Sequence, residues 1–237
     1  MNNKKILVIG GSGGIGREIV KELNNKDHEI ITADKEILNE IDLDIKNIKL
    51  DVTNLENVKE IFNSFKDDEK ISALVYCVSS KIEPKRFSFK EWKDFETHLN
   101  TQIKGFFNVY KEFHLKLEEN AKAKVIVILT EYCFGKPPTL IPDYVSSKYA
   151  LMGFVKSLAS EISPNKCTFN MVSPGPVKTN LLSNFPDKFF EILGEKNPQK
   201  KLTTPKDVAN AVSFLLDEKS ENINGVNLLV NGGEIFN

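Results

Sequence analysis

The sequence predicts an α/β fold, in which a single doubly wound parallel sheet of about seven strands carries helices on both faces. Short aliphatic runs without polar alternation recur along the chain, as is typical of strands buried on both faces. Segments with the apolar spacing of amphipathic helices separate these runs, and this alternation indicates parallel strands joined by crossover helices. The 237 residues, 41% of them hydrophobic, suit one domain that spans residues 1–237.

The expected elements follow this alternation along the whole chain. We expect strands at residues 4–9, 29–34, 47–50, 72–78, 125–130, 168–172 and 226–230. We expect helices at residues 14–25, 55–66, 91–119, 143–163 and 204–216. Thr53 or Asn54 can cap the second helix, Pro164 ends the fourth, and Pro205 suits the first position of the last.

A glycine-rich turn follows the first strand and opens the first helix. Gly10 can turn the chain without a Cβ penalty, Gly14 lets the backbone approach a pyrophosphate, and Gly16 lets the helix lie close to the sheet. The N–H groups at the helix start then face phosphates, whose charge the helix dipole favours. This order of elements is that of the dinucleotide-binding Rossmann unit. The candidate phosphate-binding residues are Gly10, Ser12, Gly13, Gly14, Ile15 and Gly16.

An acidic residue stands where a dinucleotide fold needs one. Asp34 lies eighteen residues after Gly16, at the end of the second strand. A carboxylate at this position accepts hydrogen bonds from the adenosine ribose hydroxyls. The same charge repels a 2′-phosphate, so Asp34 favours NAD over NADP as the cofactor. The adjacent Lys35 weakens that preference.

Tyr144 and Lys148 form the sharpest candidate for catalysis. They lie four residues apart on an expected helix and therefore share one face of it. A nearby ammonium favours the phenolate, so we expect Lys148 to lower the pKa of Tyr144 from ~10 toward neutrality. A tyrosine tuned in this way can give a proton to a carbonyl oxygen or take one from an alcohol.

Bulk composition argues against several other classes of function. With 32 basic and 33 acidic residues the net charge is −1, so we expect no nucleic-acid partner. No apolar run reaches the ~20 residues of a membrane span and no signal peptide precedes the first strand, so a cytoplasmic protein is expected. Cysteines and histidines show no metal-ligand spacing, and we expect no metal site. We interpret the histidines as structural or exposed: His28, His98 and His114.

Together these residues resemble the short-chain dehydrogenase/reductase family over nearly the whole chain. Ile9–Gly16 is similar to the motif T-G-x-x-x-G-I-G, with Ile9 in place of the threonine, and Tyr144 and Lys148 match Y-x-x-x-K. Asn170–Thr179 resembles N-x-x-x-P-G-x-V-x-T, and Asn231-Gly232-Gly233 resembles the C-terminal G-G turn. Length and motifs are similar to those of the family's 3-oxoacyl-carrier-protein reductases.

The resemblance implies further contacts with a nicotinamide dinucleotide. Asp51 and Val52 match the pair that contacts adenine, and Val177 and Thr179 match positions that hold the nicotinamide carboxamide. Lys148 would also bind the nicotinamide ribose. The full implied set of these contacts is Asp51, Val52, Cys77, Tyr144, Lys148, Pro174, Gly175, Val177 and Thr179.

Two departures from the family pattern concern bracing and proton relay. The motif N-N-A-G after the fourth strand reads Tyr76-Cys77-Val78-Ser79, so the asparagine's bracing role is lost or replaced. The helix-borne asparagine, three residues before a glycine, aligns with Gln102. That asparagine supports a water in a proton relay to the lysine. Gln102 keeps the amide on a longer arm, and whether it serves the relay stays open.

The position of the family's catalytic serine is a third departure. Counting thirteen residues back from Tyr144 gives Glu131, and one residue further back is Thr130. A threonine hydroxyl can orient a substrate carbonyl as serine does, whereas a carboxylate would oppose Lys148 and raise the pKa of Tyr144. We favour Thr130; Glu131, or no equivalent at all, remain alternatives.

Residues 180–202 occupy the place of the family's substrate lid. Their phenylalanines either cap an apolar pocket or pack the lid itself, and Gly194 is a possible hinge. The apolar residues in question are Phe185, Phe189, Phe190 and Leu193, with Phe134, Pro137 and Leu140 expected on the opposite wall. Family members often assemble through the helices at 91–119 and 143–163, so a homo-oligomer, a tetramer or dimer, is expected. Phe106, Phe107 and Phe113 could serve that interface or the core.

Two functions are compatible with these patterns. The first is an NAD(P)-dependent oxidoreductase that interconverts a hydroxyl and a carbonyl on a small or apolar substrate. In this function Tyr144 is the acid/base and Lys148 lowers its pKa. Thr130 orients the substrate carbonyl, and Gln102 is the candidate for the relay. The second is a catalytically impaired dinucleotide-binding or scaffolding member of the same fold. An epimerase or dehydratase acting on bound sugars is a minor third, because the chain is short for one.

Overall fold

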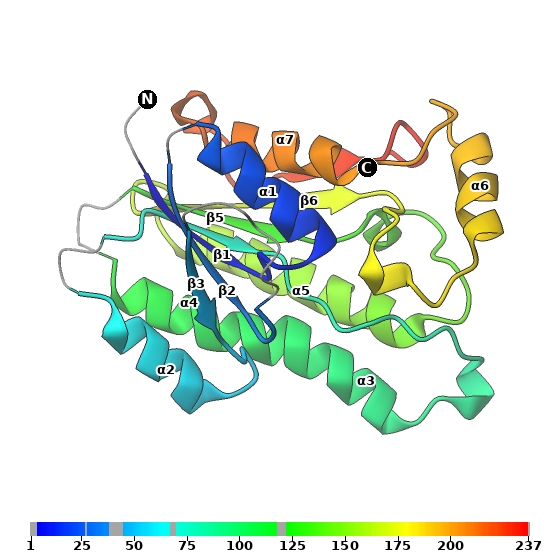
Figure 1. Ribbon diagram of the computed structural model, residues 1–237, viewed down its shortest axis with the longest axis horizontal. Helices are drawn as coiled ribbons and strands as arrows, with labels where there is room; N and C mark the ends of the chain where they lie inside the picture. Colours follow the sequence, from blue (N-terminus) through cyan, green and yellow to red (C-terminus); the bar gives the residue numbers. More distant parts are fainter. Residues whose placement is uncertain (1–3, 27, 38–44, 67–69, 118–121, 237) are drawn as a thin grey trace.

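One seven-stranded sheet organises the structure, a computed structural model that describes residues 4–26, 28–37, 45–66, 70–117 and 122–236 (Figure 1). The strand order is β3-β2-β1-β4-β5-β6-β7, and every pairing is parallel. This confirms the predicted doubly wound sheet. The strands are β1 Lys5–Ile9, β2 Glu29–Asp34, β3 Lys46–Lys49, β4 Ala73–Tyr76, β5 Ala123–Ile128, β6 Cys167–Pro174 and β7 Asn227–Val230.

Helices cover both faces of this sheet (Figure 1). On one face lie α1 Gly14–Asn24 and α7 Pro205–Leu216. On the other lie α2 Leu55–Ser64, α3 Trp92–Leu99, α4 Gly105–Leu115 and α5 Pro142–Glu161. Each face has its own apolar core, and both are built on β1, β4 and β5, whose described residues are almost all buried. Burial on both faces explains why these strands are aliphatic without alternation.

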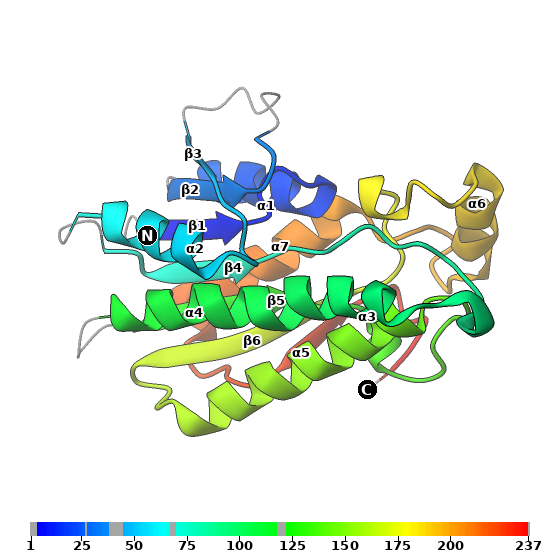
Figure 2. The same ribbon diagram turned by 90° about the horizontal axis from the view of Figure 1, so that it is seen from below.

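Local signals set the helix ends as expected. The Asn54 side chain accepts hydrogen bonds from two backbone N–H groups at the start of α2, so of the two candidates Asn54 is the cap. Thr204 and Asp207 form a capping box at the start of α7, and Pro205 occupies the first turn. Figure 2 shows α4 and α5 side by side across the sheet, where Phe106 meets Phe154 with ring centroids 5.5 Å apart.

The prediction of a single helix at 91–119 is wrong in the middle of that range. Between α3 and α4 the chain forms one π-helical turn, η2 Asn100–Lys104. The Tyr76 hydroxyl donates a hydrogen bond of 2.6 Å to the carbonyl of Thr101 within this turn. Gly105 follows it, and a Cβ there would lie 2.6 Å from the Tyr76 hydroxyl and 2.7 Å from the Val52 side chain. The widened turn thus brings the helix against β4, which a regular α-helix pattern does not reveal. Residues 118 and 119 lie outside the described part.

The lid segment contains a short 3₁₀ turn, η4 Asn180–Leu182, and one helix, α6 Asp187–Lys196. Phe185, Phe189 and Phe190 stack in sequence, with ring centroids 4.7 Å and 5.5 Å apart. Of the three aromatic residues expected at an interface or in the core, Phe106 and Phe113 belong to the core. Phe107 is 47% exposed.

Candidate active site

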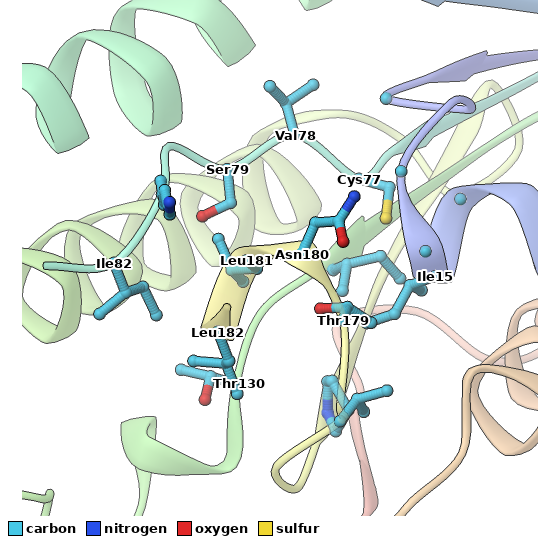
Figure 3. A pocket seen from close by; sticks show the side chains of 18 of the residues that line it. Ile15, Cys77, Val78, Ser79, Ile82, Thr130, Thr179, Asn180, Leu181 and Leu182 are labelled. Carbon is cyan, nitrogen blue, oxygen red and sulfur yellow. The ribbon is translucent and has the colours of Figure 1, made fainter. Parts of the chain in front are cut away.

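The main cavity lies at the carboxyl ends of the strands, beside the point where the strand order reverses between β1 and β4. Ligands of open α/β sheets bind at this place because the loops diverge there. Its volume is about 600 Å³, within the range of ligand pockets. In Figure 3, Ile15, Cys77 and Thr179 gather toward one end of the cavity, and Ile82, Leu182 and Thr130 toward the other.

Most residues that the sequence singled out line this one cavity. Asp51 and Val52 do not line it in the described part of the chain, and neither does Gln102. Asp51 instead pairs with Lys35, and the Val52 carbonyl accepts a hydrogen bond from Asn108. The predicted residues that line the cavity are Gly10, Ser12, Gly13, Gly14, Ile15, Gly16, Asp34, Cys77, Thr130, Tyr144, Lys148, Pro174, Gly175, Val177 and Thr179.

The glycine turn has the shape of a phosphate cradle. Gly10 has a φ of +85°, and a Cβ on Gly16 would lie 2.0 Å from the Gly10 carbonyl oxygen, so both positions exclude a side chain. Gly13 precedes α1 and no side chain caps the helix start. The first N–H groups of α1 therefore remain available to an anion, and a dinucleotide pyrophosphate fits this end.

Asp34 stands next to the cradle with its carboxylate already hydrogen-bonded. The backbone N–H groups of Ser12 and Lys35 donate to it at 3.2 Å and 2.8 Å. Burial raises the pKa of Asp34, and these backbone bonds oppose that rise. The Lys35 ammonium lies 3.0 Å from the Asp51 carboxylate and forms an ion pair with it.

Tyr144 and Lys148 lie one turn apart on α5, both buried. The Lys148 Nζ donates to the carbonyl of Ile128 at 2.8 Å and lies 5.9 Å from the centre of the Tyr144 ring. Burial lowers the pKa of Lys148 to about 8. Burial raises the pKa of Tyr144, and a hydrogen bond with Thr130 opposes this rise. The expected lowering of the pKa of Tyr144 by Lys148 is thus wrong for the ligand-free chain, because loss of water around the phenol dominates.

The structure separates the two candidates for the serine position. Thr130 lines the cavity and hydrogen-bonds with the hydroxyl of Tyr144. Glu131 is outside the cavity lining and faces Asn231 and Glu234 of the C-terminal turn. Its carboxyl group is buried, and burial raises its pKa to about 7. Of the two side chains, only Thr130 lines the cavity together with Tyr144.

Gln102 and Tyr76 tie the π-helical turn to the end of β4. The Gln102 Nε2 donates to the carbonyl of Val78 at 3.0 Å. Its Oε1 is buried and has no hydrogen-bond partner in the described structure. With the Tyr76 hydroxyl on Thr101, this is a second link between the two segments. Tyr76 and Gln102 therefore hold the π-helical turn against the end of β4.

The part of the cavity beside Tyr144 has an apolar lining. Ile82, Tyr132, Leu181 and Leu182 line it and pack around Tyr144. The sequence did not single them out, because η4 and the loop after β4 carry no motif. The phenylalanines named for the lid pack on the lid itself, and Phe185 also contacts the cluster around Tyr144. None of the seven residues expected on the two walls lines the described cavity: Phe134, Pro137, Leu140, Phe185, Phe189, Phe190 and Leu193.

The described residues hold no group of three or more His, Cys, Asp or Glu side chains that could bind a metal ion. Among the same residues, no helix combines the length and apolarity that crossing a membrane requires.

Comparison with known proteins identifies the family of the chain. Residues 10–234 match the family model described as enoyl-(acyl carrier protein) reductase. The chain is 30% identical over 239 residues to a 3-oxoacyl-[acyl-carrier-protein] reductase of Rickettsia bellii, covering 100% of this chain and 98% of the relative.

Two solved structures have the same fold. A short-chain dehydrogenase of Leptospira borgpetersenii with bound NAD⁺ is 25% identical, with a TM-score of 0.90 over 99% of this chain and 93% of that one. ElxO with bound NADP is also 25% identical, with a TM-score of 0.87 over 98% of each chain.

The fold and the site define a dinucleotide-binding oxidoreductase of the doubly wound class. The chain belongs to the short-chain dehydrogenase/reductase family. Its structural neighbours bind a nicotinamide dinucleotide, NAD⁺ in one case and NADP in another.

Proposed function

We propose that this protein interconverts a hydroxyl and a carbonyl group on a small or apolar substrate, using a nicotinamide dinucleotide. The observation that carries the proposal is that Tyr144, Lys148 and Thr130 line the same cavity as the glycine cradle and Asp34. A proton-transfer group and a dinucleotide site therefore face one another across a single space.

The position of each residue in the cavity determines the role that we propose for it. A bound dinucleotide would supply or accept the hydride. The Tyr144 hydroxyl gives a proton to the carbonyl oxygen or takes one from the alcohol, and the Thr130 hydroxyl, already bonded to Tyr144, orients the same oxygen. Lys148 holds the nicotinamide ribose, and its pKa of about 8 suits it to exchange a proton near neutral pH. The unpartnered Oε1 of Gln102 supports a water on the path to Lys148.

The apolar lining favours an acyl substrate. Ile82, Leu181 and Leu182 surround the space beside Tyr144, so a short hydrocarbon chain gains by leaving water there. The Rickettsia relative is named for a 3-oxoacyl thioester on a carrier protein. We propose a 3-oxoacyl thioester as the substrate class to test first, in the direction of reduction.

Asp34 supports NAD over NADP as the cofactor. Its carboxylate lies in the cavity next to the cradle, and the nearest lysine, Lys35, is paired with Asp51 instead of being free for a 2′-phosphate. Fluorescence titration of NADH and NADPH tests this directly. We expect tighter binding of NADH, and tighter binding of NADPH contradicts the assignment.

Turnover with 3-oxoacyl thioesters and a panel of ketones tests the main proposal. We expect Tyr144→Phe to abolish turnover and to leave NADH affinity within about twofold, because the ring is kept and only the proton donor is lost. Absence of turnover by the unmodified chain across that panel, with NADH bound, instead favours the second candidate, a dinucleotide-binding member without catalysis. The raised pKa of Tyr144 in the ligand-free chain is the observation that favours this second candidate.

The exposed Phe107 on α4 supports assembly into a homo-oligomer through the α4 and α5 face. Light scattering after size exclusion tests this, with Phe107→Ser as the variant. We expect a dimer or tetramer that dissociates in the variant, and a monomeric unmodified chain contradicts the proposal.

A further inference from the structure

Three ionisable side chains that the proposed mechanism does not use meet beside Tyr144. Lys90 lies just before α3, His98 lies in the last turn of α3, and Asp143 is the residue before Tyr144 on α5. Their side chains are only 2%, 4% and 4% exposed. None of the three lines the cavity. Any effect on the reaction must therefore pass through a neighbour.

An ion pair fixes two of these side chains. The Lys90 Nζ lies 2.5 Å from Asp143 Oδ2 and also donates to the carbonyl of Glu83 at 2.9 Å. Asp143 lies in the first turn of α5, where the helix dipole favours a negative charge. The pair thereby connects the loop after β4 to the first turn of the helix that carries Tyr144.

His98 connects this pair to the phenol. Its Nε2 lies 3.8 Å from Asp143 Oδ2, and its ring meets the Tyr144 ring edge to face, with centroids 5.8 Å apart and planes at 74°. Burial lowers the pKa of His98; Lys90 and Lys148 lower it further, while Asp143 and Asp94 oppose them. The imidazole thus packs against the phenol and does not itself line the cavity.

Burial of these three ionisable side chains costs free energy that packing of the region alone would not require. His98 Nδ1 and Asp143 Oδ1 are buried without a hydrogen-bond partner in the described structure. Buried polar atoms are nearly always partnered, and apolar side chains of similar volume often fill such a place with equal or greater stability. The arrangement therefore points to a geometric requirement at the neighbouring Tyr144.

We propose that His98, held beside the Asp143–Lys90 pair, is a positioning residue for Tyr144. The T-shaped contact between the two rings keeps the phenol turned toward Thr130, with which the Tyr144 hydroxyl is bonded. A change of ring orientation moves the hydroxyl away from the substrate oxygen, and small misplacements of a reacting group cost rate steeply. The consequence for turnover rests on the proposed function, but the effect on the orientation of the ring does not.

Three variants distinguish the effect of the His98 ring from the effect of the volume that it fills. His98→Ala removes the ring that packs against Tyr144, and we expect kcat to fall about tenfold to a hundredfold. The KM and the Kd for NADH should stay within about threefold. His98→Phe keeps an aromatic edge, and kcat should stay within about threefold of the unmodified chain. His98→Leu fills most of the space without a ring edge and replaces the alanine variant if that variant does not fold.

A second readout needs no turnover. A 3-fluorotyrosine placed at position 144 reports the ring orientation by ¹⁹F NMR, because the chemical shift of fluorine depends on the groups that surround it. We expect one narrow resonance in the unmodified chain and in His98→Phe, and a second or broadened resonance in His98→Ala and His98→Leu. If the unmodified chain turns over no substrate, the proposed function fails while this spectrum still decides the role of His98.

Two results overturn the inference. One is an unchanged ¹⁹F spectrum in both His98→Ala and His98→Leu. The other is a parallel loss of kcat, NADH affinity and melting temperature, since that combination indicates a general loss of structure and not a misplaced phenol.

Discussion

Removing one oxygen atom from Tyr76 should measure how strongly the end of β4 holds the π-helical turn. Tyr76 is fully buried, and its ring packs against Phe106 with centroids 5.3 Å apart. Tyr76→Phe keeps that ring contact and deletes the hydroxyl that donates to the Thr101 carbonyl at 2.6 Å. The loss is one buried hydrogen bond plus the cost of a less satisfied carbonyl, about 1–2 kcal/mol of unfolding free energy. For a chain of this length that corresponds to roughly 2–8 °C in melting temperature.

Urea unfolding followed by circular dichroism is the assay, with the slope of the transition checked for constancy between variants. The matched control is Tyr149→Phe, since Tyr149 is 41% exposed and its hydroxyl should be worth less than about 0.5 kcal/mol. A loss below about 0.3 kcal/mol for Tyr76→Phe would refute the view that this hydroxyl braces the turn.

Three further variants test other parts of the structure. Lys124 donates hydrogen bonds to two carbonyls at the end of α7 and to Ser220, so Lys124→Met should lower the free energy of unfolding in urea by about 2 kcal/mol. The control, Lys122→Met on the exposed surface, should lower it by under about 0.5 kcal/mol. Equal losses in the two variants would contradict this prediction. Burial raises the pKa of Glu131 from 4.5 to about 7, so its contribution to stability is present below pH 4.5 and lost as the pH rises through 7. Between pH 5 and pH 8 the unfolding free energy should therefore fall more in the unmodified chain than in Glu131→Gln. Parallel pH profiles of the two chains would exclude a raised pKa of Glu131. Gly16→Ala places a Cβ 2.0 Å from a backbone oxygen of Gly10, so NADH binding should weaken at least tenfold, and unchanged affinity in fluorescence titration would show that the cradle does not bind the cofactor.

Much of the fold could be read from the sequence because its signals are local. The aliphatic runs that became β1, β4 and β5 are buried on both faces, and this removes the polar alternation that other strands carry. The glycine turn was recognisable for the same reason, since close approach between Gly10 and Gly16 leaves no room for a side chain. Asp34 followed from its spacing to that turn.

The serine position shows where local signals end. Thr130 and Glu131 are adjacent; counting thirteen residues back from Tyr144 gives Glu131, the chemistry of the side chains favoured Thr130, and of the two Thr130 lines the cavity. The direction in which each side chain points depends on the short 3₁₀ turn η3 Glu131–Cys133, whose first residue faces Asn231 about a hundred positions away. No pattern in the loop encodes that contact.

The electrostatics of Tyr144 show the same limit. Its distance of four residues from Lys148 predicted a lowered pKa, but the spacing carries no information about water. In the folded chain the Lys148 ammonium is held by the Ile128 carbonyl, and burial raises the pKa of the phenol. Likewise His98 gave no signal of its own, because Lys90 and Asp143 reach it from other segments.

The sequence by itself determined the parallel sheet, the phosphate cradle, the acid at Asp34 and the Tyr144–Lys148 pair, since each depends on residues close together in the chain. The tertiary structure alone decided that Thr130 faces the cavity, that Tyr76 braces a π-helical turn, and that a buried ion pair and an imidazole lie beside Tyr144. These features depend on desolvation and on contacts between distant segments, which exist only after the helices have packed on the sheet.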